Sequence, residues 1–250
     1  MNSTRLTGAL FDTSTNQPDT MPRVVIDLEK LRHINCGLGR FSLYLAQELL
    51  ARSDNCFEPV FFLPENCDHY FTGTPNAKYD SIKVHPWNKE SFQRWVRPIG
   101  RHFKKDSGPA LWHVTHQTSK YLPFDDRMPV VLTVHDLNFL HVTDCNYRPK
   151  RIHQRLARIQ KLVTRATAIV TGSKYTATDL AKHIDVGSKV IHVVPNGLTQ
   201  PSEIIHNQPS WAPKSPFIFS IGNFLQHKNF HTLIEICLLY TSPSPRDRSL

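Results

Sequence analysis

The sequence has few of the features that would place a protein in a membrane or an oxidising compartment. No apolar run approaches the roughly 20 residues needed to span a bilayer, and the first twenty residues lack the continuous apolar core of a secretory signal. The five cysteines are odd in number and scattered, with no C-x-x-C pair and no partner at metal-ligand spacing. We therefore expect a cytoplasmic protein that works without a metal or other cofactor.

The composition bounds the size of the core and the charge of the partner. The chain has 250 residues and a mass of 28.7 kDa, enough for one large domain or two modest ones. A formal charge of +9 and a pI near 9.4 indicate an anionic partner. Nucleic acid, anionic lipid and a phosphorylated substrate all fit, and charge alone does not choose between them.

Short apolar runs alternate with amphipathic helical patterns along most of the chain. This alternation predicts a doubly wound, Rossmann-like parallel α/β sheet. The segment 65–87 lacks periodicity, and we interpret it mainly as loop. Residues 91–105 form a basic amphipathic pattern, which is typical of a helix on an anionic membrane or of an ordinary domain helix with a basic solvated face. The expected strands are 23–28, 58–64, 111–115, 130–134, 168–171 and 189–194. The expected helices run through 41–50 and 151–165 and from Ser173, as N-cap, through Leu180.

Changes in composition predict five segments. Residues 1–22 are expected to be a disordered lead-in, 23–198 a first α/β domain, and 199–215 a Pro-containing linker. Residues 216–237 predict the beginning of a second, truncated α/β domain, with a buried strand at 217–222 followed by a helix. The stretch 238–250 breaks the helical pattern and resembles an unrelated, artefactual read-through; a natural disordered tail is the alternative.

The run Val130–Val134 and the two residues after it are the strongest functional signal. Five β-branched or aliphatic residues predict a strand buried on both faces, and His135 and Asp136 follow at once. In open α/β sheets, ligands bind beyond the carboxyl ends of the strands, so these two residues are candidate catalytic groups. The alternative is that they begin a loop in which Asp136 caps the next turn.

A second candidate site is the glycine pair Gly37 and Gly39, between the first strand and the first helix. Glycines let backbone N–H groups approach an anion, and a helix N-terminus favours negative charge. The G-x-G motif is weak on its own, and the loop before it is too long for a dinucleotide fingerprint. A structural turn and a phosphate contact are both compatible with this pattern.

Taken in order, the motifs resemble the N-terminal part of a retaining glycosyltransferase of family 4 with the GT-B architecture. The matching segments cover roughly residues 23–237 and comprise Gly37-Leu38-Gly39-Arg40, Val134-His135-Asp136-Leu137, Ile169-Val170-Thr171-Gly172-Ser173, Val193-Val194-Pro195-Asn196-Gly197, Ser220-Ile221-Gly222 and His227-Lys228-Asn229. Such enzymes pair two Rossmann-like domains, the first mostly holding the acceptor and the second the nucleotide-sugar donor.

The resemblance implies a role for each matched residue. His135 lies near the transferred sugar, with Asp136 orienting its loop; Gly37, Gly39 and Arg40 face the donor diphosphate, and Lys228 neutralises it. No metal is implied. The implied reaction is transfer of a hexose, with mannose as one option, to a lipid-linked or polysaccharide acceptor such as a lipopolysaccharide precursor. It proceeds with retention of configuration, and the enzyme is cytoplasmic, with peripheral contact to the inner face of an anionic membrane. Because the family's acidic donor motif is absent from this chain, little transfer by the chain alone is expected.

Two other functions fit parts of the sequence. A dinucleotide-dependent oxidoreductase would use the glycine turn, but the motif is incomplete and no clear acidic ribose ligand follows about twenty residues later. A non-enzymatic basic binding module is suggested by charge alone. Because no recognised DNA or RNA motif is present, we expect no nucleic-acid partner.

Overall fold

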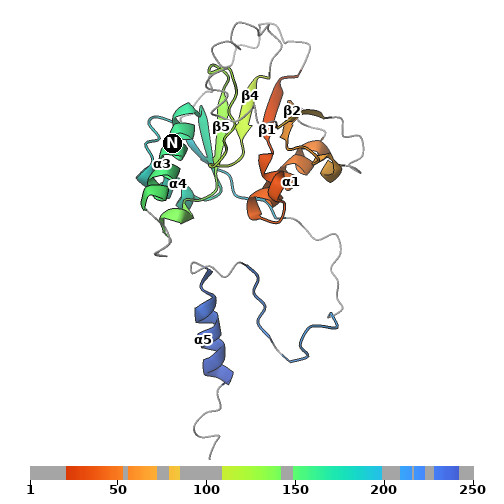
Figure 1. The fold of residues 1–250 in the computed structure, drawn as a ribbon, viewed down its shortest axis with the longest axis vertical. Helices are drawn as coiled ribbons and strands as arrows, with labels where there is room; N and C mark the ends of the chain where they lie inside the picture. The colour runs from red at the N-terminus through yellow and green to blue at the C-terminus, as the bar shows by residue number, and fades with distance from the viewer. Residues whose placement is uncertain are drawn as a thin grey trace, which may run out of the picture. The chain divides into compact units, whose positions relative to one another are not determined.

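A computed structural model describes residues 21–52, 56–71, 79–84, 109–141, 149–198, 209–215, 217–222 and 228–241. Strands and helices alternate along these ranges (Figure 1). The strands are β1 (Arg23–Asp27), β2 (Glu58–Leu63), β3 (Asp80–Lys83), β4 (Leu111–Val114), β5 (Val130–Val134), β6 (Ala168–Thr171) and β7 (Ile191–Val193). The α-helices are α1 (Gly37–Ala51), α3 (Pro149–Arg165), α4 (Lys174–His183) and α5 (Phe230–Thr241); the 3-10 helices are η1 (Glu29–His33), η2 (Asp68–Phe71) and η4 (Asn138–Leu140).

The strands form one seven-stranded sheet in the order β3-β2-β1-β4-β5-β6-β7. β1 pairs in parallel with β2 on one side and with β4 on the other. The chain therefore proceeds outward to β3 and then returns past β1, which makes the β1–β4 boundary the topological switch point of the sheet. The predicted doubly wound, Rossmann-like parallel sheet is confirmed.

The chain divides into two compact units. The first lies within Met1–Thr133 and Arg165–Ala168, the second within Val134–Thr164 and Ile169–Leu250. In the first unit, α1 packs against the β1–β2 side of the sheet (Figure 1). Burial of each large side chain contributes about 1.5–3 kcal/mol, so this cluster positions η1 and the turns beyond the strands. Its buried members are Ile26, Leu28, Leu31, Leu43, Ala46, Phe61, Leu63, Cys67 and Phe71.

In the second unit, the predicted amphipathic helix and helix cap are confirmed. Helix α3 buries Ile159, Leu162 and Val163, which recur at helical spacing on one face. The backbone N–H of Thr176 donates to the Ser173 hydroxyl at 3.1 Å, so Ser173 caps α4 as expected. Leu180 of α4 is fully buried.

One strand lies within a segment that we interpreted mainly as loop. β3 pairs in parallel with β2 at the edge of the sheet, so the loop interpretation of residues 80–83 was wrong. The strand is four residues long, and three of them are exposed. A short, charged edge strand needs no apolar run, because only one side pairs and little of it is buried.

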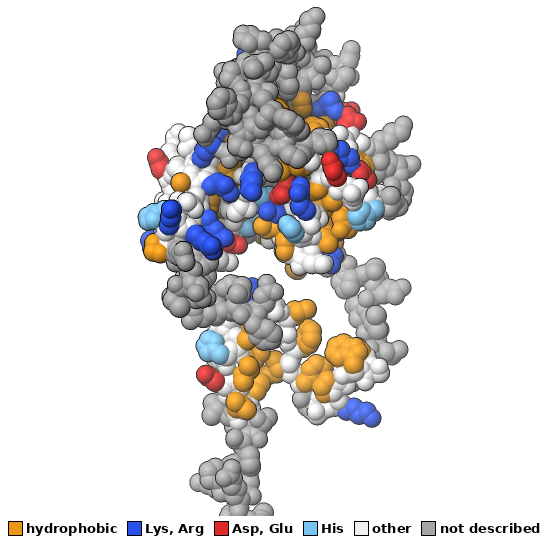
Figure 2. Space-filling view, viewed as in Figure 1, with side chains coloured by type: hydrophobic (Ala, Val, Ile, Leu, Met, Phe, Trp, Pro, Cys, Tyr) orange, Lys and Arg blue, Asp and Glu red, His pale blue; other side chains and the backbone are white. Residues whose placement is uncertain are grey.

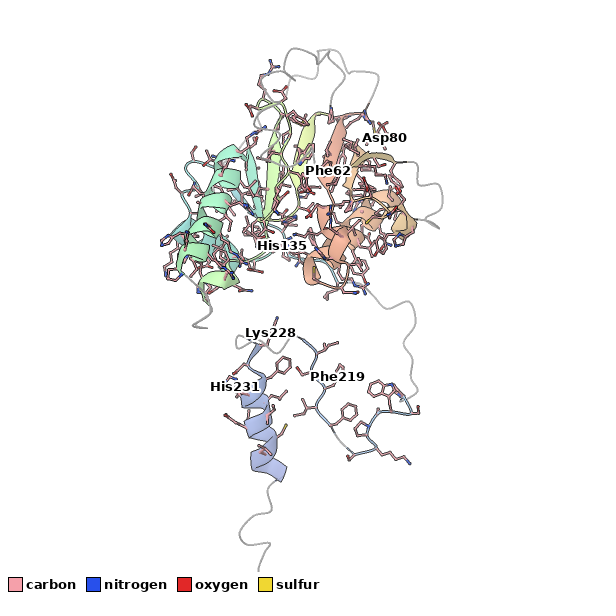
Figure 3. The ribbon with its side chains drawn as sticks, viewed as in Figure 1. Phe62, Asp80, His135, Phe219, Lys228 and His231 are labelled. Carbon is pink, nitrogen blue, oxygen red and sulfur yellow. The ribbon has the colours of Figure 1, made fainter. Side chains whose placement is uncertain are left out.

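The expected strand at 217–222 is also wrong. These residues form no strand, and Phe217, Ile218, Phe219 and Ile221 are 49–86% exposed (Phe219 is labelled in Figure 3). A strand is defined by its ladder of hydrogen bonds to a neighbour, and no described segment pairs with this one. The helix expected after it is present as α5 and continues to Thr241, so the first four residues of the 238–250 stretch are helical.

Several predictions fall outside the described residues. They concern the lead-in up to residue 20, the basic amphipathic pattern at 91–105, residues 199–208 of the linker and the tail from 242. These stay predictions.

Candidate functional site at the topological switch point

A buried carboxylate lies at the switch point, at the end of β1. The side chain of Asp27 is fully buried. The Ser119 hydroxyl donates to its Oδ2 at 2.6 Å, and the backbone N–H of Glu29 donates to its Oδ1 at 3.0 Å. The Thr115 hydroxyl donates to the Asp27 carbonyl oxygen. Asp27 thus ties the end of β1 to the residues that follow β4, across the point where the strand order reverses.

The environment of Asp27 makes it titrate in the physiological range. Desolvation by burial raises its pKa from the usual 3.8 to about 6, and the negative charge of Glu29 adds to that rise. The hydrogen bonds from Ser119 and from the Glu29 N–H, together with the Lys30 ammonium, oppose it. A carboxyl group perturbed in this way at a strand end is a candidate functional group.

An imidazole and a carboxylate lie beside this network. His116 follows β4 and is 1% exposed. The Thr118 backbone N–H donates to its Nδ1 at 3.2 Å, so the proton of the neutral ring is assigned to Nε2. That Nε2 lies 3.7 Å from Oε2 of Glu29. This separation is longer than a hydrogen bond, and the hydrogen bond from the Thr118 N–H to Nδ1 orients the ring.

The two glycines of the turn before α1 have different surroundings. A Cβ on Gly39 would lie 2.2 Å from the backbone oxygen of His33, whereas a Cβ on Gly37 would meet nothing within 4 Å. Gly39 therefore permits the close packing of α1 against η1, and its N–H donates to Cys36 Sγ at 3.4 Å. Gly37 has open space where a side chain would be, and Arg40 is exposed, which suits the approach of a ligand.

His135 and Asp136 follow β5 directly, as expected (His135 is labelled in Figure 3). The Thr176 hydroxyl donates to the His135 carbonyl oxygen at 3.2 Å, so α4 fixes the backbone that carries the imidazole. Asp136 Oδ1 accepts from the Asn138 N–H at 3.1 Å. The local capping that we considered for Asp136 is thus present, and it shapes the turn into η4.

The predicted site residues are distributed over three parts of the chain. Gly37, Gly39 and Arg40 belong to the first unit, and His135 and Asp136 begin the second. Lys228 is exposed and lies two residues before α5, where Asn229 has a positive φ of 55° and accepts a hydrogen bond from the Thr232 hydroxyl at 2.9 Å. The roles assigned to these residues stay predictions.

Sequence reasoning missed the network around Asp27. A signal was present, because Asp27 follows the apolar run Val24-Val25-Ile26 much as His135 follows Val130–Val134. Its partners Thr115 and Ser119 lie about ninety positions away along the chain, and no local pattern connects them.

Two searches of the described residues bear on cofactors and on membranes. Within these residues, no group of three or more His, Cys, Asp or Glu side chains is arranged to hold a metal ion. None of the helices in this part of the chain combines the length and apolar character required to cross a membrane.

A parallel sheet with polar groups at a topological switch point defines a ligand-binding α/β protein of the doubly wound class. The sequence model of Glycosyltransferase Family 4 matches residues 36–199, from the cap of α1 to just past β7. The match covers well over half of the chain, so this chain belongs to glycosyltransferase family 4, as its motifs predicted. No curated protein matches the chain in a sequence search.

Proposed function

We propose that this chain contains the acceptor-side domain of a retaining hexosyltransferase, with residues 216–237 beginning its donor-binding domain. The enzyme transfers a hexose from a nucleotide-sugar to a lipid-linked or polysaccharide acceptor, and mannose is the first sugar to test. The observation that carries the proposal is the family membership, together with an imidazole placed directly after the buried strand β5.

In the proposed reaction, the bond between the anomeric carbon and the donor phosphate oxygen breaks. The diphosphate leaves with the electron pair and accepts the proton of the attacking acceptor hydroxyl, and the new C–O bond forms on the same face of the sugar. His135 hydrogen-bonds the sugar as positive charge develops, and Asp136 keeps the His135 loop in place. Gly37 lets backbone approach the diphosphate, and the cations of Arg40 and Lys228 offset its charge. No metal takes part in this proposal.

The basic surface supports an anionic acceptor or membrane. Helix α3 has five exposed cationic side chains and contains no acidic residue. Figure 2 shows Lys and Arg side chains gathered on the part of the surface formed by α3 and α4. Such a face attracts anionic headgroups at about 1 kcal/mol per cation near the surface, which supports a cytoplasmic enzyme that associates peripherally with the inner face of the membrane. The exposed cations of α3 are Lys150, Arg151, Arg155, Arg158 and Lys161.

The test is transfer by the full-length gene product, measured as acceptor-dependent incorporation of labelled sugar from a panel of nucleotide-sugars. Replacing His135 by Ala should lower the transfer rate roughly 10²–10³-fold while the circular dichroism spectrum is unchanged. The matched control is His153→Ala, because His153 is exposed on α3 and is not among the residues assigned to the reaction. An unchanged rate in His135→Ala would remove this residue from the site, and no transfer from any donor would overturn the proposed function.

A further inference from the structure

A pocket of about 430 Å³ lies in the first unit, beyond the carboxyl ends of β2 and β3. Its walls come from η1, from the turn and the 3-10 helix η2 that follow β2, and from residues after β3 and β4. The volume falls within the range of about 300–1,000 Å³ that small-molecule sites have. The side chains that could contact a ligand are Arg32, Glu65, Asn66, His69, Tyr70 and Tyr121.

One wall of the pocket offers both hydrogen-bond donors and acceptors. Arg32, Glu65, Asn66 and His69 are exposed. Asn66 has a positive φ of 62°, and its carbonyl oxygen bonds His69 Nδ1 at 2.8 Å. Because a carbonyl can only accept, Nδ1 is the donor, and the neutral ring presents Nε2 as an acceptor. A non-glycine residue in the left-handed region is uncommon and often occurs at functional sites.

Aromatic rings supply the apolar surface of the pocket. The rings of His69 and Tyr70 lie 4.0 Å apart between centroids. Tyr121 is 4% exposed, and the ring of Phe62 packs against it edge-on at 5.0 Å. Burial and the charge of Glu29 raise the pKa of Tyr121, so its phenol keeps its proton. The pocket thus combines apolar ring surface with side chains that bond hydroxyl groups.

The charges at the pocket are balanced. Among the described residues that line the pocket, Arg32 is the one Lys or Arg side chain, and its Nε lies 3.9 Å from Oε1 of Glu29. Glu65 contributes a carboxylate to the lining. An anionic phosphate would therefore meet one cation and a nearby negative charge, whereas a neutral ligand would meet no net repulsion.

We propose that this pocket binds a neutral pyranose unit of the acceptor glycan. A pyranose ring has hydroxyl groups that both donate and accept, and a face of C–H bonds that packs on aromatic rings. Those are the two kinds of contact that the walls supply. The inference rests on the proposed function, because it assigns the acceptor sugar to a site separate from the residues predicted to bind the donor.

The test is a titration of the 250-residue chain followed by backbone amide NMR. The probes are the methyl pyranosides of mannose, glucose and galactose, with inorganic phosphate and UMP as anionic comparisons. At least one pyranoside should shift the amides of Arg32, Asn66 and Tyr70 in a saturable way. Glu65→Ala and His69→Ala should each weaken that binding about tenfold or more, the effect of losing a hydrogen bond to a charged or well-placed group. Their matched controls, Glu48→Ala on α1 and His153→Ala on α3, replace exposed residues outside the pocket and should bind as the unaltered chain does.

Each outcome separates this inference from the proposed function. If no pyranoside shifts these amides, or if phosphate or UMP shifts them in place of the sugars, the pocket is not a neutral sugar site. Transfer by the full-length gene product with no sugar binding here would overturn this inference alone. Saturable sugar binding at the pocket without transfer from any donor would overturn the proposed reaction and leave the pocket as a saccharide site. If Glu65→Ala loses amide dispersion, which would show that it is unfolded, Glu65→Gln replaces it because glutamine keeps the shape of the side chain.

Discussion

The Ser119 hydroxyl lies 2.6 Å from Oδ2 of Asp27 and donates a hydrogen bond to it. The two residues are 92 positions apart. Asp27 is the last residue of β1 and Ser119 follows β4, and these two strands flank the switch point. Neither side chain has access to water, so the bond holds two strand ends together where doubly wound proteins bind ligands.

Replacing Asp27 by Ala should destabilise the chain. The Ser119 hydroxyl and the Glu29 N–H would each lose a buried acceptor, and an unsatisfied buried group costs about 1–3 kcal/mol. The free energy of unfolding, measured by urea denaturation at pH 7, should fall by an amount in that range. Asp80→Ala is the control, because Asp80 is exposed on the edge strand (labelled in Figure 3). Its ion pair with Arg23 is a surface interaction worth at most about 1 kcal/mol. Equal losses in the two variants would contradict the role of Asp27.

Asp27 should also make stability depend on pH. Its pKa is about 6 in the folded chain and near its usual 3.8 in the unfolded chain, so between these values the folded state binds more protons. The contribution is fully present below about pH 4 and is lost as pH rises through about 6, an effect of about 3 kcal/mol. Denaturation of the unaltered chain and of Asp27→Asn across this range measures it. The difference between the two should decline with rising pH, and a rising difference would show that the carboxyl is stabilised in its charged form.

The two glycines before α1 should respond differently to a methyl group. Gly39→Ala would place a Cβ against the backbone of His33 and Ile34, and overpacking of this kind costs about 1–3 kcal/mol. Gly37→Ala meets nothing within 4 Å and should change stability by no more than about 0.5 kcal/mol. Thermal or urea unfolding compares them. If Gly37 also approaches the donor diphosphate, its variant should lose transfer activity in the full-length gene product without losing stability.

The cap of α4 should contribute measurably to the second unit. Ser173→Ala removes the acceptor of the Thr176 N–H and should lower the free energy of unfolding by about 1 kcal/mol. Ser173→Asp should restore most of this, because its carboxylate accepts the same bond and favours the helix N-terminus. Thr178→Ala, at an exposed position within α4, should be neutral or slightly stabilising. A loss in Thr178→Ala equal to that in Ser173→Ala would show that the cap bond is unimportant.

Local patterns predicted most of the regular structure. Val130–Val134 is a strand with the predicted bounds, and Ser173 caps the helix that it was expected to cap. Both depend on neighbours in sequence, since a buried strand needs a short apolar run and a helix cap needs a hydroxyl at the right position. The motif order similarly predicted the family, which the match over residues 36–199 confirms.

Local sequence patterns predicted the wrong structure where the pairing of a strand depended on residues far away in the sequence. Phe217–Gly222 has the composition of a buried strand, but without a neighbouring strand among the described residues it forms none. Asp80–Lys83 has no apolar run, and it becomes a strand because β2 offers it an edge.

By itself, the sequence determined the alternation of strands and helices, the positions of the glycine turn and of His135, and membership of a glycosyltransferase family. Only the tertiary structure decided that Asp27 is a buried carboxyl with a raised pKa, that Gly39 is required by the backbone of His33, and that residues following four different strands line a pocket. The physical reason is that desolvation and close packing depend on atoms brought together from distant parts of the chain, whereas strand and helix patterns depend on residues a few positions apart.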